Sequence, residues 1–145
     1  MRFSYIGGPR QRPDLKQPAK EAWQNFVEDG LRAEKLGFDS FFIGEHHFCF
    51  ASGNSSPFVM LAEVAARTER IRVGTSITCL PFHNPLRVAE DIAAVDIVSK
   101  GRFDFGFGVG SQYREFHTFG IPYKDRFART WEAVDIIERC LSGTE

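Results

Sequence analysis

The sequence predicts an α/β fold with a parallel sheet, and three observations lead to this prediction. Short runs rich in β-branched and aromatic residues alternate four times with segments of helical periodicity along the 145 residues. The links from each helix to the next strand are very short, whereas the links from strand to helix are long. Parallel strands need a crossover helix, so strand–helix units in a row indicate a parallel sheet.

The four predicted strands cover residues 2–6, 38–43, 71–78 and 102–109. Their spacing is that of a (β/α)8 barrel of the TIM type, whose eight units occupy about 250 residues, so the chain holds four of the units that a closed barrel needs. Along the last strand, aromatic residues alternate with Asp104, Gly106, Gly108 and Gly110. We expect the aromatic face to pack on helices. The glycine face would allow either tight backbone packing or the approach of a planar ligand.

Each predicted strand is followed by a segment with helical periodicity. Pro57 and Pro85 lie where the second and third helices would begin, because the first turn of a helix tolerates proline. Gly37 and Gly101 lie where helices would end, a position that favours glycine. The residues expected on the buried faces of the four helices are Trp23, Phe26, Val27, Gly30 and Leu31; Phe58, Leu61, Ala62 and Ala65; Val88, Ile92, Val95 and Val98; and Phe127, Trp131, Val134 and Leu141.

Composition argues against several classes of protein. A formal net charge of -1 and an isoelectric point of about 6.4 give no general attraction for nucleic acid or for an anionic membrane, and no segment suits a membrane span. Cys49, Cys79 and Cys140 lie far apart without a Cys-x-x-Cys motif, which argues against a disulfide scaffold or a zinc site. Because the N-terminus also lacks the features of a secretory signal, we expect a cytoplasmic protein.

The four histidines all fall in the long links between strand and helix. These links cover residues 7–18, 44–56, 79–84 and 110–123, and they hold His46, His47, His83 and His117. Barrels and doubly wound folds both place binding and catalytic groups on the loops at the carboxyl ends of parallel strands. We therefore expect the functional site at this end of the sheet.

Glu45, His46 and His47 end the second predicted strand and form the main candidate cluster. Adjacent side chains of an extended chain point to opposite faces, so both histidines enter one site only if the strand breaks there. This disfavours a metal site, and we predict none. A titratable cluster at this place suits a general acid or base, although a hydrogen-bonded surface pair of histidines also fits the spacing.

The glycines of the fourth strand do not form a dinucleotide-binding motif. They follow G-x-G-x-G instead of G-x-G-x-x-G, and no helix begins directly after them to hold a pyrophosphate. Further along, Arg126 lies near the start of the fourth helix, where backbone N–H groups also favour an anion. An arginine at that place could bind a phosphate through two hydrogen bonds.

Four motifs, in order along the chain, resemble those of the bacterial luciferase-like flavin monooxygenases. They are residues 41–48, 65–75, 80–91 and 99–110, followed by Glu115 and Phe116. The resemblance covers essentially the whole chain and the N-terminal half of a usual family member. It implies one domain over residues 1–145, made of the first four units of the (β/α)8 barrel.

The resemblance also implies a chemistry. Members bind reduced FMN that a flavin reductase supplies, or F420 in some branches. The reduced FMN reacts with O2 to a C4a-peroxide, which oxidises a small organic substrate such as an aldehyde, a ketone, a sulfonate or an alkane. His46 would be the acid or base of this reaction, and Glu45 and His47 would shape its pocket.

For the cofactor, the resemblance implies a non-proline cis peptide bond at Ser76–Ile77 against the flavin ring. Arg126 matches an arginine that relatives keep. The remaining candidates for cofactor binding are the residues of the glycine face, Gly106, Gly108 and Gly110.

A half barrel would have two open sheet edges, at its first and fourth strands, with little charge to protect them. We therefore expect a homo-oligomer, in its simplest form a C2 dimer that closes an eight-stranded barrel. Two alternatives to the monooxygenase stay open. One is a non-catalytic flavin-binding or interaction protein, and the other is an F420-dependent oxidoreductase.

Overall fold

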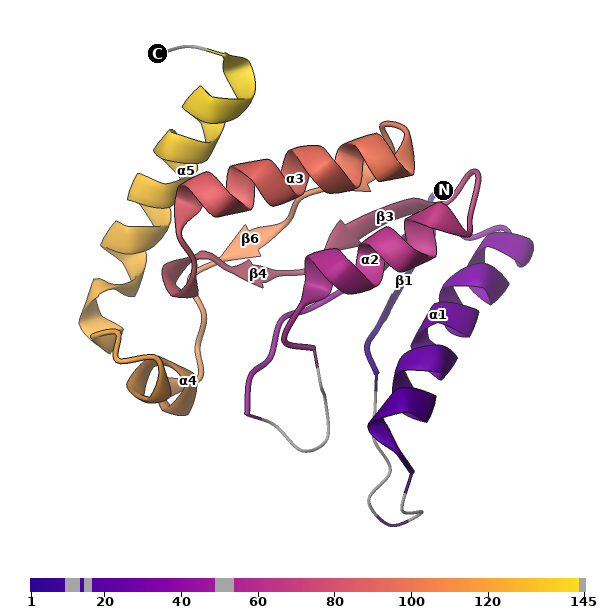
Figure 1. The fold of residues 1–145 in the computed structure, drawn as a ribbon, viewed down its shortest axis with the longest axis horizontal. Helices are drawn as coiled ribbons and strands as arrows, with labels where there is room; N and C mark the ends of the chain where they lie inside the picture. The colour runs from indigo at the N-terminus through magenta and orange to yellow at the C-terminus, as the bar shows by residue number, and fades with distance from the viewer. Residues whose placement is uncertain (10–13, 15–16, 49–53, 144–145) are drawn as a thin grey trace.

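A computed structural model of the chain describes residues 1–9, 14, 17–48 and 54–143. Cys49 and parts of the predicted links 7–18 and 44–56 lie outside the described residues. Strands and helices alternate along the described chain (Figure 1), which confirms the α/β fold.

Within the described residues, short strands form two parallel sheets. β1 (Ser4–Gly7), β2 (Ser40–Ile43), β3 (Arg72–Thr75) and β5 (Phe103–Asp104) lie side by side in that order in the main sheet. β4 (Thr78–Cys79) pairs with β6 (Phe107–Gly108) in a smaller sheet. All neighbours are parallel and follow the order of the sequence, as successive units of a (β/α)8 barrel do.

The prediction of continuous strands over 71–78 and 102–109 was wrong, because each of them is divided. β3 and β4 are separated by Ser76–Ile77, and β5 and β6 by Phe105–Gly106. The Thr75 hydroxyl donates to the Gly106 carbonyl at 2.7 Å and accepts from the Gly106 N–H at 3.0 Å. A side chain therefore satisfies backbone groups that a continuous ladder would have paired.

Helices follow the strands and pack on one face of the main sheet. They are α1 (Ala19–Lys35), α2 (Pro57–Ala66) and α3 (Pro85–Ser99), and α5 (Arg126–Ser142) packs against α3. As predicted, Pro57 and Pro85 begin α2 and α3. Gly37 and Gly101 follow the ends of α1 and α3 with φ of +84° and +79°, a conformation that glycine adopts without strain.

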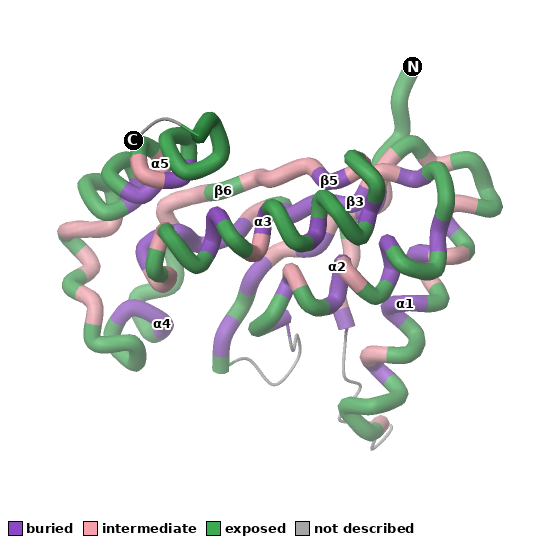
Figure 2. The backbone as a smooth tube through the Cα atoms, turned by 45° about the horizontal axis from the view of Figure 1, so that its top comes forward, coloured by how far each residue is buried: buried purple, intermediate pink, exposed green. Residues whose placement is uncertain are grey.

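The hydrophobic core lies between the main sheet and these helices, whose inner faces are buried (Figure 2). Phe41, Ile43 and Val73 of the sheet pack against residues of α1, α2 and α3. The aromatic face of the fourth predicted strand does meet helices, as expected. The rings of Phe103 and Phe105 pack against the ring of Phe58 in α2, and the ring of Phe107 packs against Trp131 in α5.

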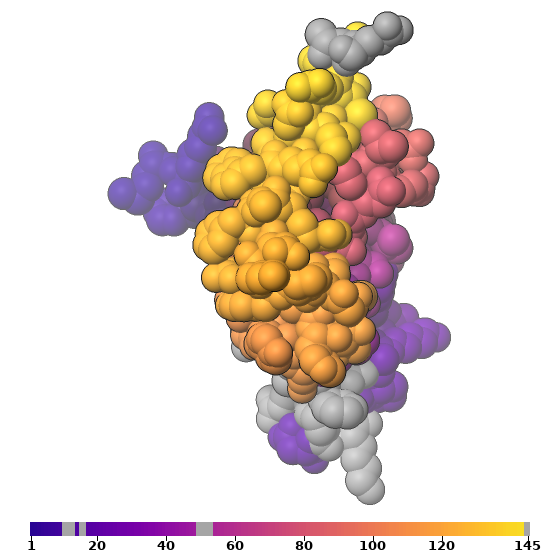
Figure 3. Space-filling view, turned by 90° about the vertical axis from the view of Figure 1, so that its left-hand side faces the viewer, coloured from indigo at the N-terminus to yellow at the C-terminus, as the bar shows by residue number. Residues whose placement is uncertain are grey.

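The buried face of α5 differs from the predicted one. Phe127, Trp131 and Leu141 are 52%, 63% and 49% exposed, on a helix that forms one side of the molecule (Figure 3). Val98 of α3 is also exposed. Periodicity shows which residues share a face, but α5 has two apolar faces, and packing selects the one with the smaller side chains. The buried residues of α5, which contacts α3 and the 3₁₀ turn η2 (Leu80–Phe82), are Thr130, Ala133 and Ile137.

Glu34, in the last turn of α1, holds the start of β3 in place. Its carboxylate accepts hydrogen bonds from the backbone N–H groups of Glu69 at 3.0 Å, Arg70 at 2.7 Å and Ile71 at 2.8 Å. Partial burial raises the pKa of Glu34. The three hydrogen bonds and the charge of Arg70 lower it by more than burial raises it, so the pKa of Glu34 is below its usual value.

The Glu34→Gln variant is therefore expected to be less stable than the parent at pH 7, by about 1 kcal/mol. A carboxyl whose pKa is lowered by folding stabilises the protein above its unfolded pKa and loses that effect as the pH falls through the folded pKa. The difference in melting temperature between parent and variant should therefore shrink from pH 7 to pH 2.5. Thermal unfolding followed by circular dichroism measures it, with Glu138→Gln on the exposed side of α5 as control. A difference that stays constant with pH would contradict this role.

Candidate active site

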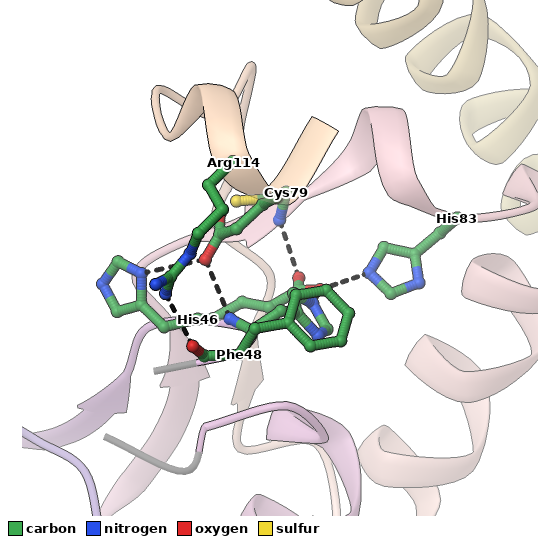
Figure 4. Close-up of polar contacts among 8 residues, drawn as sticks. His46, Phe48, Cys79, His83 and Arg114 are labelled. Atoms are coloured by element: carbon green, nitrogen blue, oxygen red, sulfur yellow. Dashed lines mark hydrogen bonds and ion pairs between the residues drawn. The ribbon is translucent and has the colours of Figure 1, made fainter. Parts of the chain in front are cut away.

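Acid–base residues gather where the chain leaves β2 and β4 at the carboxyl end of the sheet (Figure 4). Glu45 lies at the centre, with its side chain fully buried. Its Oε1 atom lies 2.6 Å from Nε2 of His47 and 2.7 Å from Nε2 of His83, and its Oε2 atom accepts from the Cys79 N–H at 2.8 Å. The Glu45 N–H donates to the Ile77 carbonyl at 3.0 Å. One residue thus joins the segments that follow β2 and β3.

Electrostatics keep Glu45 ionised. Burial raises the pKa of its carboxyl, but the hydrogen bonds from His47 and His83, the positive charge of a protonated His83 and the Cys79 N–H together lower the pKa below its usual value. Burial also raises the pKa of the Cys79 thiol to about 12, with further contributions from the charges of Glu45 and Glu115. The thiol next to the cluster is therefore protonated at neutral pH.

His47 is enclosed by aromatic rings. The centroid of its ring lies 4.8 Å from that of Phe119, 5.8 Å from that of Phe82 and 6.0 Å from that of Phe48. Its backbone N–H donates to Oε1 of Glu115 at 2.8 Å. His47 is therefore held at its backbone by Glu115 and at Nε2 of its ring by Glu45, and it is nearly shielded from water.

His46 has the opposite surroundings, as the alternation of an extended chain predicts. Its side chain is 50% exposed, and its Nδ1 atom lies 3.7 Å from Oε1 of Glu115. Figure 4 shows His46 and His83 on opposite sides of the cluster. The two adjacent histidines therefore do not enter one site: His47 is part of the buried network, and His46 faces outward.

A small cavity of about 140 Å³ opens beside His46. It brings together several candidates that are far apart in the sequence, namely Glu45, His46, Ser76, Ile77 and Gly110. The cis peptide bond expected at Ser76–Ile77 is present in its wall. A Cβ atom on Gly44 would lie 3.0 Å from the Ser76 carbonyl oxygen, so the backbone itself forms this part of the wall.

The other candidates lie outside this cavity. A Cβ atom on Gly106 would lie 2.2 Å from the Thr75 carbonyl oxygen, and one on Gly108 would lie 3.0 Å from Cδ1 of Ile77. Tight packing of neighbouring chain therefore suffices to explain these two glycines. Arg126 has its guanidinium 4.0 Å from the centroid of the Tyr123 ring and donates to the Tyr123 carbonyl at 2.9 Å.

Sequence reasoning missed two members of the cluster. His83 lies in a predicted link, but no local signal shows that it contacts a residue 38 positions away. Glu115 belongs to α4 (Tyr113–Thr118), a short helix inside the predicted link 110–123. Its neighbour Arg114 donates to the Phe48 carbonyl at 2.6 Å, so α4 is attached to the segment that follows Glu45.

A larger cavity of about 650 Å³ lies at the opposite, amino ends of the strands. In its lining, Arg72 forms an ion pair with Asp104 at 2.6 Å, and the Glu34 carboxylate is occupied by backbone N–H groups. Across the described ranges, no group of three or more His, Cys, Asp or Glu side chains could hold a metal ion. No described helix combines the length and the hydropathy that crossing a membrane requires.

These features define a class of protein, in which strand–helix units of a (β/α)8 barrel carry acid–base residues at the carboxyl ends of their strands. The family model described as luciferase-like monooxygenase matches residues 1–145. The chain therefore belongs to the luciferase-like monooxygenase family.

Two named relatives agree with this assignment. The chain is 36% identical over 130 residues to the 4-hydroxyprotoasukamycin monooxygenase of Streptomyces nodosus subsp. asukaensis, covering 90% of this chain and 35% of that relative. It superposes on the structure of monooxygenase RslO1 from Streptomyces bottropensis with a TM-score of 0.90 and 33% identity, covering 96% of this chain and 42% of that one. The chain thus spans between a third and a half of the length of these relatives.

Two more solved structures have a similar fold. The first is the oxygenating constituent of 3,6-diketocamphane monooxygenase from Pseudomonas putida, in complex with FMN, with a TM-score of 0.88, 24% identity and coverage of 96% of this chain and 38% of that one. The second is the coenzyme F420-dependent tetrahydromethanopterin reductase from Methanopyrus kandleri, with a TM-score of 0.57, 27% identity and coverage of 83% of this chain and 30% of that one. The partial coverage fits four units of a barrel.

Proposed function

We propose that the chain is the N-terminal half-barrel of a flavin-dependent monooxygenase, which uses reduced FMN and O2 to oxidise a small organic molecule. The observation that carries this proposal is the cavity beside His46, at the carboxyl ends of the strands of a luciferase-like chain. Cys79 and Cys140 are free thiols, which suits the cytoplasm, where we place the protein.

The residues of this cavity fit part of a flavin. Part of its wall is backbone at Gly44 and Ser76–Ile77, where no Gly44 side chain would obstruct the approach of a planar ring. Ligand pockets usually measure about 300–1,000 Å³, so a cavity of about 140 Å³ would hold part of the ring while the rest extends over the open side of the sheet. Arg126 is the candidate for the phosphate, and in this structure its guanidinium stacks on Tyr123.

When bound, reduced FMN would supply the electrons that activate O2. His46, half exposed beside the cavity, would hold or move a proton at an imidazole nitrogen, with the Glu115 carboxylate 3.7 Å from its Nδ1. Glu45 and His47 would fix the wall of the cavity and exclude water behind it, because both side chains are buried and hydrogen-bonded to each other.

The choice of cofactor rests on likeness alone. The oxygenating constituent of 3,6-diketocamphane monooxygenase, whose structure contains FMN, matches with a TM-score of 0.88. The F420-dependent reductase matches with a TM-score of 0.57. We therefore propose reduced FMN, supplied by a flavin reductase, and keep F420 as the alternative.

The test supplies the chain with an NADH-driven flavin reductase, FMN and ¹⁸O2, and offers an aldehyde, a ketone, an alkyl sulfonate and an alkane as probe substrates. Mass spectrometry should detect a product with one ¹⁸O atom, formed only in the presence of the chain. Saturable binding of FMN without any labelled product would instead favour a non-catalytic flavin-binding protein. Hydride transfer with reduced F420 and none with FMN would favour the F420-dependent oxidoreductase.

We also propose that the 145-residue chain pairs with a second copy. β1 and β5 are the edge strands of the described sheet, so each has one side without a neighbouring strand, where a strand of another chain could pair. Near the β1 edge, Phe3 and Ile6 are 59% and 64% exposed. Two copies related by a twofold axis could pair β1 of each with β5 of the other and close an eight-stranded barrel.

Size exclusion with light scattering should therefore give twice the mass of one 16.4 kDa chain at micromolar concentration. The Ile6→Lys variant should shift the mass towards that of one chain, because it places a charge at the proposed edge. Leu36→Lys, on an exposed residue after α1, serves as the control and should keep the parental mass. A well-folded parent with the mass of a single chain would contradict self-association.

A further inference from the structure

His83 contacts Glu45 but has no task in the function proposed above. Its side chain is 29% exposed and lies beside an outer cavity of about 270 Å³, which Arg129 and Glu132 of α5 also line. On its other side, Nε2 reaches the fully buried Oε1 of Glu45 at 2.7 Å. His83 thus connects the buried carboxylate to a place that water reaches.

Both imidazoles of the cluster donate to the same oxygen atom. An ionised carboxylate only accepts hydrogen bonds, so His47 and His83 each carry a hydrogen on Nε2. A further proton would bind to Nδ1 of one ring and make it a cation. The single negative charge of Glu45 compensates one such cation. A second imidazolium would be repelled by the first, because both rings contact the same oxygen atom.

The two rings differ in burial. The side chain of His47 is 10% exposed, against 29% for His83, and the rings of Phe48, Phe82 and Phe119 surround it. A charge costs more free energy where water is excluded. We propose that His83 is a positioning residue that shares Oε1 of Glu45 with His47 and takes up the proton that would otherwise charge His47, so that His47 stays neutral beside the active site.

Other charged groups face the pair from the neighbouring elements. From α4, Glu115 accepts the His47 N–H, and Arg114 binds the Phe48 carbonyl. From α5, Arg129 and Glu132 share the outer cavity with His83, and Arg129 donates to the Pro81 carbonyl at 3.2 Å. His46 belongs to the same segment as His47 and faces outward, and the Cys79 thiol is uncharged at neutral pH. All of these groups stay unchanged when His83 alone is replaced.

The test is a pH titration of the ¹⁵N-labelled chain by long-range ¹H–¹⁵N NMR, which reports the protonation and tautomer of each imidazole. In the parent, both neutral rings should carry the hydrogen on Nε2, and His83 should take up a proton at a higher pH than His47. The His83→Gln variant keeps a donor for Glu45 but cannot be charged. The titration midpoint of His47 should therefore rise by about one pH unit, a tenfold increase in proton affinity.

The control is His117→Gln on the exposed side of α4, which should leave the midpoint of His47 unchanged. A parent in which His47 is charged before His83, or an unchanged midpoint in His83→Gln, would overturn the inference. If His83→Gln does not fold, the order of titration in the parent decides alone. The inference rests on the proposed function only because that function places these residues at the active site. A chain that binds no flavin would overturn the proposed function but would leave the result of this titration unchanged.

Discussion

The His46→Ala variant is expected to lose about 10²- to 10⁴-fold in turnover, which is the usual contribution of a positioned acid or base. Among the described residues that line the cavity, His46 supplies the one imidazole, and half of its side chain is exposed to an incoming molecule. The affinity for reduced FMN should change little, because Gly44 and the backbone at Ser76–Ile77 form the wall against the ring. Steady-state rates with a substrate found in the ¹⁸O2 test, together with an anaerobic FMN titration, separate the two effects.

His117→Ala is the matched control, because His117 is an exposed histidine on α4 that does not line the cavity. It should keep the parental rate. A His46→Ala variant that oxidises substrate at the parental rate would show that His46 is structural, and the assignment of the acid or base would fail.

A second large effect is expected from Gly106→Ala, which should destabilise the fold by about 3 kcal/mol or more. The added Cβ atom would lie 2.2 Å from the carbonyl oxygen of Thr75, and backbone cannot move aside without breaking the bonds between Thr75 and Gly106. Gly108→Ala is the matched control from the same glycine face. Its Cβ atom would lie 3.0 Å from the end of the flexible Ile77 side chain, so the loss should stay below about 1 kcal/mol.

Urea unfolding of the parent and both variants measures this difference in the free energy of unfolding. Equal losses for Gly106→Ala and Gly108→Ala would contradict the packing explanation of the glycine face. If Gly108→Ala is as stable as the parent but binds reduced FMN more weakly, this result would support Gly108 as a cofactor-binding residue.

The order and the type of the main elements could be predicted from the sequence, because apolar periodicity, helix-start prolines and helix-end glycines are local signals. The division of the third and fourth strands could not, because it depends on Thr75 meeting Gly106, which is 31 positions away. The covered face of α5 depends on its packing against α3 and η2, which no pattern within α5 reveals.

The candidate site was predicted in part for the same reason. Glu45, His46 and His47 are adjacent, so their alternation could be inferred from the extended chain. The contact of His83 with Glu45 joins residues from two separate units, and Glu115 reaches His47 from a helix that has no clear signal of its own. Only the folded chain shows that one carboxylate serves two imidazoles.

Binding of reduced FMN beside His46 is tested most directly by anaerobic ¹H–¹⁵N NMR of the chain during titration with reduced FMN. We predict saturable shifts for residues that line the cavity at the carboxyl ends of the strands, with Ser76, Gly110 and Ser111 as reporters. Asp39 and Arg70, which line the cavity at the amino ends, should not shift. Shifts confined to Asp39, Arg70 and their neighbours, or a folded chain without any saturable shift, would contradict a flavin site at His46.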